Sequence, residues 1–179
     1  MHAPSPAVPR FGHDRLTMDP ALARALAEAL HAAERAEDGT PILVHVRRVA
    51  RMVPAEARAV AWLHEALEST AVTEQELLME GLTRDELRAL RLLRRMSDAR
   101  SDGVYLAHME LIARAAGRSG RLARTVKIAD LADRCLHPRM RPDGWSPPYA
   151  DGLDLLLDMS VDPVSDAWAA AERAPEAPV

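Results

Sequence analysis

The amino-acid sequence predicts an all-α protein, and three observations support that fold class. Alanine, leucine and arginine, which are good helix formers, are abundant, whereas aromatic residues make up only 3% of the 179 residues. Apolar residues recur every three or four positions over most of the chain. No segment alternates with the period of two that a half-buried strand requires. We therefore expect a bundle of helices.

Eight helices are predicted in chain order. Their expected ranges are 20–38, 41–53, 54–70, 73–81, 83–97, 102–117, 120–137 and about 147–159.

Residues with special backbone or capping roles set the limits of these helices. The first three each start at a proline, and Gly39 follows the first of them. Thr73 with Glu76, and Thr83 with Glu86, form capping-box patterns that start the fourth and fifth helices. A proline stops the seventh helix.

The two ends of the chain are predicted to be flexible. Residues 1–18 contain several prolines, and residues 161–179 end in a mixture of proline, alanine and glutamate. Such segments bury little apolar surface. The helical domain is expected to cover residues 19–160, and a chain of this length is long enough for one domain with a core but short for two.

Composition restricts the setting in which the protein works. A net charge of -4 gives no sign of nucleic-acid or anionic-membrane binding, although a local basic patch could still bind phosphate. The single cysteine, Cys135, excludes an internal disulfide framework. The sequence has no apolar run of transmembrane length and no signal-peptide pattern at its start. We expect a cytoplasmic protein that binds neither nucleic acid nor membranes, and the oligomeric state stays open.

Three residues with metal-binding side chains lie in apolar stretches of separate predicted helices. They are His45, His64 and Asp130. Glu68 shares a helix face with His64, whereas Glu65 lies about 100° round the same helix. If one metal ion binds all three, their ligand atoms should lie within about 5 Å of one another. The alternative is a polar network in the core without a metal, since buried polar groups need partners of some kind.

Three segments in this order resemble the HD-domain superfamily of metal-dependent phosphohydrolases. They are HAAERAEDGTPILVH (31–45), WLHEALEST (62–70) and VKIADLADR (126–134). The likeness is closest to the RelA/SpoT-type and small stand-alone (p)ppGpp hydrolases, and it covers about residues 20–160. It implies an HD-domain-like helical bundle that holds one divalent metal, most commonly manganese. The ligands carried over are His45, His64, Glu65 and Asp130, a set that also suits iron, zinc, nickel or cobalt.

The resemblance also implies a reaction and further residues. The metal would acidify water and polarise a phosphoryl oxygen, and the substrate would be a nucleotide phosphate, with (p)ppGpp losing its 3′-pyrophosphate as the specific case. Glu68 and Ser69 stand where the family has its water-activating pair. Lys127, Arg35 and Arg134 are the predicted substrate-binding cations. Lys127 is the only lysine among 23 basic residues, which favours a need for a compact ammonium there.

Several positions depart from the family pattern. The His-Asp pair is His64-Glu65, the second water-activating carboxylate is Ser69, and the asparagine four residues after Asp130 is Arg134. The arginine that stacks on guanine is replaced by Ala36. Three function classes therefore stay open. The first is an HD-type phosphohydrolase, the second a catalytically degenerate HD protein with a metal- or nucleotide-binding regulatory role, and the third a helical interaction module without a metal.

Overall fold

The computed structural model describes residues 17–36, 38–94, 101–138 and 146–159. These residues form helices and no strands, which confirms the predicted all-α class. The helices are α1 (Pro20–Leu30), α2 (Ile42–Met52), α3 (Arg58–Leu63), α4 (Ala66–Ser69), α5 (Glu74–Met79), α6 (Arg84–Leu93), α7 (Asp102–Arg114), α8 (Gly117–Leu136) and α9 (Tyr149–Asp158), with a 3₁₀ turn at Ala55–Ala57. Residues 1–16 of the predicted N-terminal tail and the whole predicted C-terminal tail, residues 161–179, lie outside the described residues.

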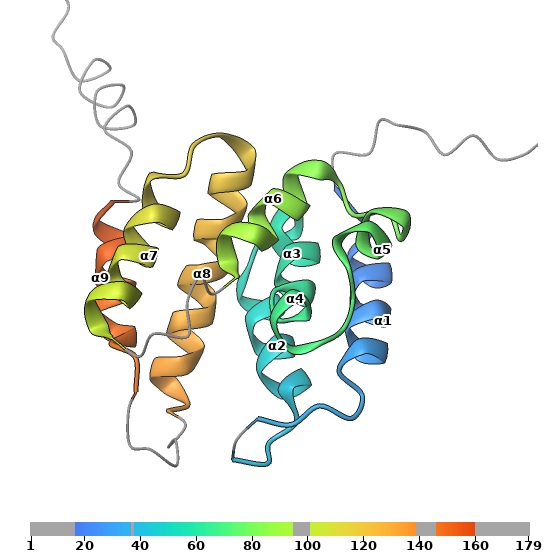
Figure 1. The fold of residues 1–179 in the computed structure, drawn as a ribbon, viewed down its shortest axis with the longest axis horizontal. Helices are drawn as coiled ribbons and strands as arrows, with labels where there is room; N and C mark the ends of the chain where they lie inside the picture. The colour runs from blue at the N-terminus through green and yellow to red at the C-terminus, as the bar shows by residue number, and fades with distance from the viewer. Residues whose placement is uncertain (1–16, 37, 95–100, 139–145, 160–179) are drawn as a thin grey trace, which may run out of the picture.

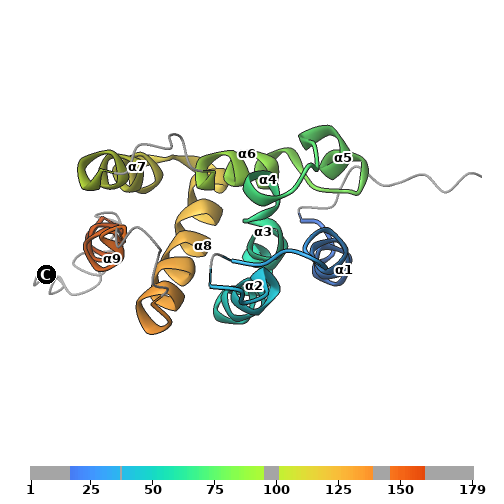
Figure 2. The same cartoon turned by 60° about the horizontal axis from the view of Figure 1, so that its bottom comes forward.

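The long helix α8 lies at the centre of the bundle. Helices α1 to α5 lie on one side of it, and α7 and α9 on the other (Figures 1 and 2). α8 packs against α6, α9 and α2, and the core beside it contains the fully buried Leu63, Val126 and Leu131. This arrangement brings the middle of α8 next to α2 and α3. No helix in the described part of the chain is long and apolar enough to cross a membrane.

The first helix is shorter than predicted. It ends at Leu30 instead of continuing to residue 38. The chain then makes a tight turn, in which the Ala36 N–H donates to the Thr40 carbonyl at 2.8 Å and Gly39 adopts a φ of 80°. A positive φ is readily available to glycine, which suits Gly39 to this turn. The predicted helix was too long because the backbone groups of Glu34 and Ala36 pair with Ile42 and Thr40 across the turn and do not continue the helix.

The third predicted helix is interrupted in its middle. α3 ends at Leu63 and α4 begins at Ala66, so His64 and Glu65 lie at the junction and not within one continuous helix over 54–70. Both keep right-handed helical dihedral angles, with φ values of -64° and -90°. Neighbouring residues of a regular helix point about 100° apart. At this interruption, the side chains of His64 and Glu65 reach the same place beside α8.

Both predicted capping boxes are present. The Thr73 and Thr83 hydroxyls accept from the backbone N–H groups of Glu76 and Glu86, and each glutamate accepts in return from its threonine N–H. Glu86 is fully buried and also accepts from the Met18 N–H at 3.0 Å. The second box therefore ties the start of the described chain to α6.

The buried capping box yields a stability prediction. Glu86→Gln is expected to lower the free energy of unfolding by about 1–3 kcal/mol, because the amide keeps only one acceptor oxygen for the Met18 and Thr83 donors and its NH₂ faces the buried Met18 N–H. The matched control is Glu76→Gln in the exposed box, where water replaces the lost bond and the loss is expected to be smaller. Urea denaturation measures both. Equal losses for the two variants would contradict this assignment.

Candidate metal centre

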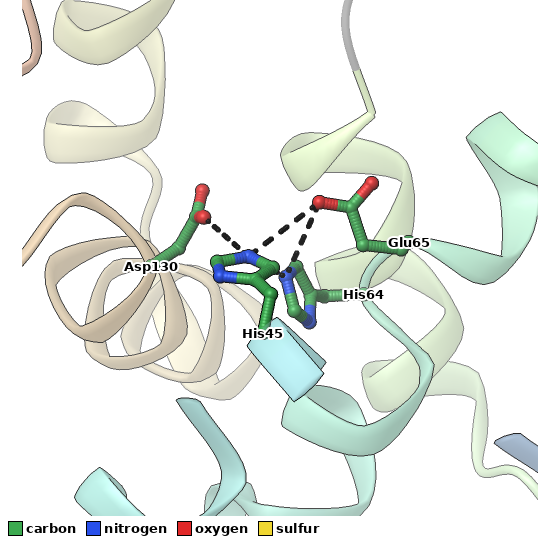
Figure 3. Close-up of side chains that lie close together, drawn as sticks. All are labelled: His45, His64, Glu65 and Asp130. Atoms are coloured by element: carbon green, nitrogen blue, oxygen red, sulfur yellow. Dashed lines mark hydrogen bonds and ion pairs between the residues drawn. The ribbon is translucent and has the colours of Figure 1, made fainter. Parts of the chain in front are cut away.

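Four side chains converge beside α8. His45, His64, Glu65 and Asp130 each offer one ligand atom, and these atoms all lie within 4.8 Å of one another (Figure 3). His45 comes from α2, His64 and Glu65 from the junction of α3 and α4, and Asp130 from the middle of α8. The expected convergence of the two histidines with Asp130 within about 5 Å is confirmed. The cluster is buried, with Glu65 the most accessible of the four.

The backbone and a carboxylate determine how the two histidines face the cluster. His64 Nδ1 lies 2.7 Å from the Ala61 carbonyl, which can only accept, so Nδ1 carries the proton of the neutral ring. His45 Nδ1 lies 2.6 Å from Asp133 and is assigned as a donor in the same way. Both Nε2 atoms then point into the cluster, 3.2 Å apart. In the neutral rings each Nε2 is unprotonated and carries a lone pair. This is the form of histidine that binds a metal.

These Nε2 atoms also face carboxylate oxygens. Asp130 Oδ1 lies 3.0 Å from His45 Nε2, and Glu65 Oε1 lies 3.6 Å from the Nε2 atoms of both histidines. The lone pair of a histidine Nε2 and a carboxylate oxygen repel each other at these distances unless a positive charge lies between them. Burial opposes the charged form of His45, but hydrogen bonds to Asp130 and Asp133 outweigh it and raise its pKa. Burial lowers the pKa of His64. The cluster thus has a place for one cation, either a proton on His45 or a metal ion.

The donor set fits a divalent transition metal. Two imidazole nitrogens and two carboxylate oxygens suit manganese, iron, cobalt, nickel or zinc. Ligand atoms at about 2.0–2.2 Å from one ion lie at most about 4.4 Å apart. A spread of 4.8 Å therefore requires a contraction of only a few tenths of an ångström. The four residues could hold a metal ion, and the donor types do not select among these metals.

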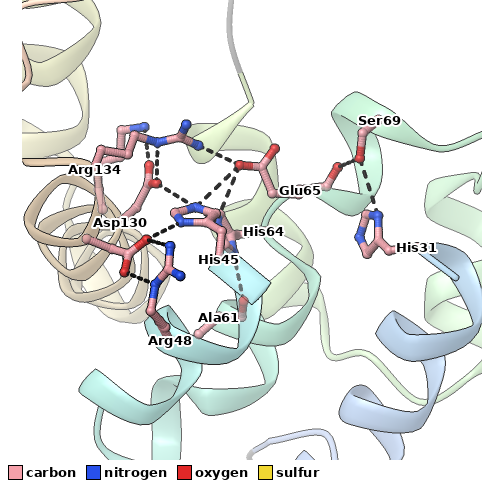
Figure 4. Close-up of polar contacts among 11 residues, drawn as sticks. His31, His45, Arg48, Ala61, His64, Glu65, Ser69, Asp130 and Arg134 are labelled. Atoms are coloured by element: carbon pink, nitrogen blue, oxygen red, sulfur yellow. Dashed lines mark hydrogen bonds and ion pairs between the residues drawn. The ribbon is translucent and has the colours of Figure 1, made fainter. Parts of the chain in front are cut away.

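Two cations neutralise the carboxylates of the cluster. Arg134 donates from Nε to Asp130 Oδ1 and from Nη2 to Glu65 Oε1, both at 2.6 Å (Figure 4). Lys127 donates to the other Asp130 oxygen at 2.8 Å. Burial disfavours the charged carboxylates, but the positive charges around Glu65, that of Arg134 foremost, outweigh burial and lower the pKa of Glu65 to about 2. Arg134 and Lys127 together hold the pKa of Asp130 well below its usual value.

Two positioning residues were missed in the sequence. Asp133 is buried and accepts from His45 Nδ1 on one side and from two guanidinium nitrogens of Arg48 on the other, at 2.5 and 2.9 Å. A carboxylate on the far nitrogen of a ligand histidine fixes its tautomer and ring orientation. Their spacing was the available signal: Asp133 follows Asp130, and Arg48 follows His45, by three residues on one helix face.

The other predicted site residues lie outside the four-residue cluster. Glu68 is exposed. The Ser69 hydroxyl donates to the Glu65 carbonyl at 2.8 Å and lies 3.5 Å from Nδ1 of the buried His31. Arg35 is exposed in the loop between α1 and α2, where its backbone forms an isolated bridge with Pro41. Of the predicted substrate-binding cations, only Lys127 and Arg134 touch the cluster.

No family model matches the chain, and no curated protein matches it either. The resemblance to the HD-domain superfamily therefore stays a prediction that rests on the three sequence segments.

Proposed function

We propose that this protein is a metal-dependent phosphohydrolase of HD type that acts on a nucleotide phosphate. The single observation that carries the proposal is the buried convergence of His45, His64, Glu65 and Asp130 within 4.8 Å. Burying two imidazoles and two carboxylates from three separate parts of the fold costs free energy unless these groups find partners. A divalent ion bound by all four side chains would provide that partner.

The residues of the chain would divide the work of such a reaction. A divalent ion in this place supplies Lewis-acid chemistry, which acidifies water and polarises a phosphoryl oxygen. Asp133 and Arg48 hold the His45 ring in orientation. Lys127 and Arg134 bring positive charge to within hydrogen-bond distance of the ligand carboxylates, where an anionic phosphate would meet them. Glu68 and Ser69 would position the attacking water.

The finer assignments follow from the resemblance alone. We propose manganese as the metal and the cytoplasm as the location, and (p)ppGpp, losing its 3′-pyrophosphate, as the first substrate to test. The absence of the guanine-stacking arginine at Ala36 makes a wider panel of nucleotide phosphates necessary.

A second candidate function is a catalytically degenerate HD protein that binds a metal or nucleotide for regulation. Two observations favour it. Ser69 replaces a carboxylate, and its hydroxyl is committed to the Glu65 carbonyl. Arg134 already neutralises both ligand carboxylates. Metal binding without turnover would support this candidate over the enzyme.

Metal analysis and a hydrolysis screen test the proposal together. Purified protein is expected to contain, or to bind after chelator treatment, one divalent ion per chain. With manganese present it is expected to release phosphate or pyrophosphate from at least one member of a nucleotide panel. A protein that binds none of the five transition metals would rule out the enzyme and the metal-binding form of the second candidate, and one that also binds no nucleotide would leave only the interaction module without a metal.

The water-activating position gives a prediction about rate. A positioned general base contributes about 10²–10⁴-fold, and serine supplies no base near neutral pH. Ser69→Asp is therefore expected to raise the hydrolysis rate by roughly tenfold or more, and Glu65→Asp in addition should raise it further by restoring the His-Asp pair. Asp and Ser have similar helix propensity. Ser69→Asn is the matched control, since it has the size of Asp without the charge. A folded, metal-binding Ser69→Asp protein with an unchanged rate would contradict the mechanism.

A further inference from the structure

Among the described residues, Arg134 is the cation nearest to the candidate ligands, and it donates to the same oxygens that face the histidines. Its Nε bonds Asp130 Oδ1, the oxygen 3.0 Å from His45 Nε2. Its Nη2 bonds Glu65 Oε1, the oxygen 3.6 Å from the Nε2 atoms of His45 and His64. The guanidinium thus bridges the two carboxylate oxygens that face the histidines through its planar fork, as Figure 4 shows.

Lys127 gives a contrast within the same site. It carries the same charge and lies at a similar hydrogen-bond distance, 2.8 Å from Asp130. It donates to Oδ2, however, and the oxygen that faces His45 is Oδ1. Lys127 therefore compensates the charge of Asp130 without using a candidate ligand atom of the cluster.

From this difference we infer that Arg134 is a built-in competitor of the divalent ion, which must take the two bridged oxygens from the guanidinium in order to bind. This inference rests on the proposed metal site and describes its regulation. A guanidinium and a divalent ion that share the same two oxygens also repel each other at close range in a site with little solvent. Metal occupancy of this protein is consequently lower than its four ligands alone would support.

The guanidinium also contacts an aromatic ring while it bonds the two carboxylates. Its central carbon lies 5.7 Å from the centroid of the Tyr149 ring, at the start of α9. An arginine within about 6 Å of an aromatic face gains a favourable cation–π interaction. The ring therefore adds to the carboxylate bonds in holding Arg134 where it competes with a divalent ion.

Metal titration of three variants tests the inference. Chelator-treated wild type, Arg134→Gln and Lys127→Gln are titrated with MnCl₂ by calorimetry, and circular dichroism checks each fold. Arg134→Gln is expected to bind Mn²⁺ at least tenfold more tightly than wild type, which is about 1.4 kcal/mol. Lys127→Gln, which removes an equal charge, is expected to gain clearly less. Arg134→Lys keeps the charge but cannot bridge both oxygens, so it is expected to fall between wild type and Arg134→Gln, and it serves if Arg134→Gln does not fold.

The outcomes separate this inference from the proposed function. If wild type binds Mn²⁺ and neither Arg134 variant gains affinity, Arg134 does not compete and only this inference fails. Equal gains for Arg134→Gln and Lys127→Gln would also overturn it, because general charge repulsion would then explain both. If no variant binds Mn²⁺, and parallel titrations with iron, cobalt, nickel and zinc also show no binding, the metal site itself is refuted, and this inference with it. Binding by Arg134→Gln alone would support both.

Discussion

Asp130→Asn is expected to lower the free energy of unfolding by about 3–5 kcal/mol when a chelator is present. The Asp130 side chain is only 3% exposed and accepts from Lys127 and Arg134, and its Oδ1 lies 3.0 Å from His45 Nε2. Asparagine keeps the size of the side chain but removes the charge, so two cations at the site lose an ionic partner. Leaving such charges uncompensated in a buried place is more costly than losing a neutral hydrogen bond.

Asp85→Asn is the matched control for this prediction. Asp85 also accepts from an arginine, Arg88, at 3.1 Å, but its side chain is 40% exposed and that of Arg88 62% exposed. An exposed pair of this kind contributes about 1 kcal/mol or less. Urea denaturation of both variants at one pH measures the difference. A loss below about 1 kcal/mol for Asp130→Asn would mean that water reaches the cluster and screens its charges.

His64→Gln is expected to weaken Mn²⁺ binding by at least about a hundredfold. Removing a residue that merely supports a ligand already costs about 10–100-fold, and His64 offers a ligand atom itself. An ion that binds only the folded state stabilises it, by about 2.7 kcal/mol at a hundred times the dissociation constant. Wild type should therefore melt at a higher temperature when MnCl₂ is added, and His64→Gln should show almost no such shift.

His108→Gln is the control for the metal prediction. His108 also contacts a backbone carbonyl, that of Leu92 at 2.8 Å, but it lies on α7 and is not part of the cluster. The variant is expected to keep the manganese-dependent rise in melting temperature. An equal loss of the rise in both variants would show that manganese acts on the protein somewhere other than the proposed centre.

The local signals in the sequence were sufficient for the helices and for the identity of the candidate ligands. Capping boxes at Thr73 and Thr83 are local features, because donor and acceptor lie three residues apart, and both formed as predicted. The ends of the first and third predicted helices were wrong. At the first, Glu34 and Ala36 pair with residues 42 and 40 across a turn and do not continue the helix. The third predicted helix is interrupted at His64 and Glu65.

The sequence by itself determined which side chains are able to bind a metal, since His45, His64 and Asp130 stand out as polar residues in apolar helices. Only the tertiary structure decided what surrounds them. Packing of α8 against α2 and α3 brings Asp133 within hydrogen-bond distance of His45. It also places the Arg134 guanidinium between Glu65 and Asp130. Residues 65 and 134 are 69 positions apart, so no local pattern encodes their contact. The physical reason is that the free energy of a buried charge depends on partners that only the folded chain brings within hydrogen-bond distance.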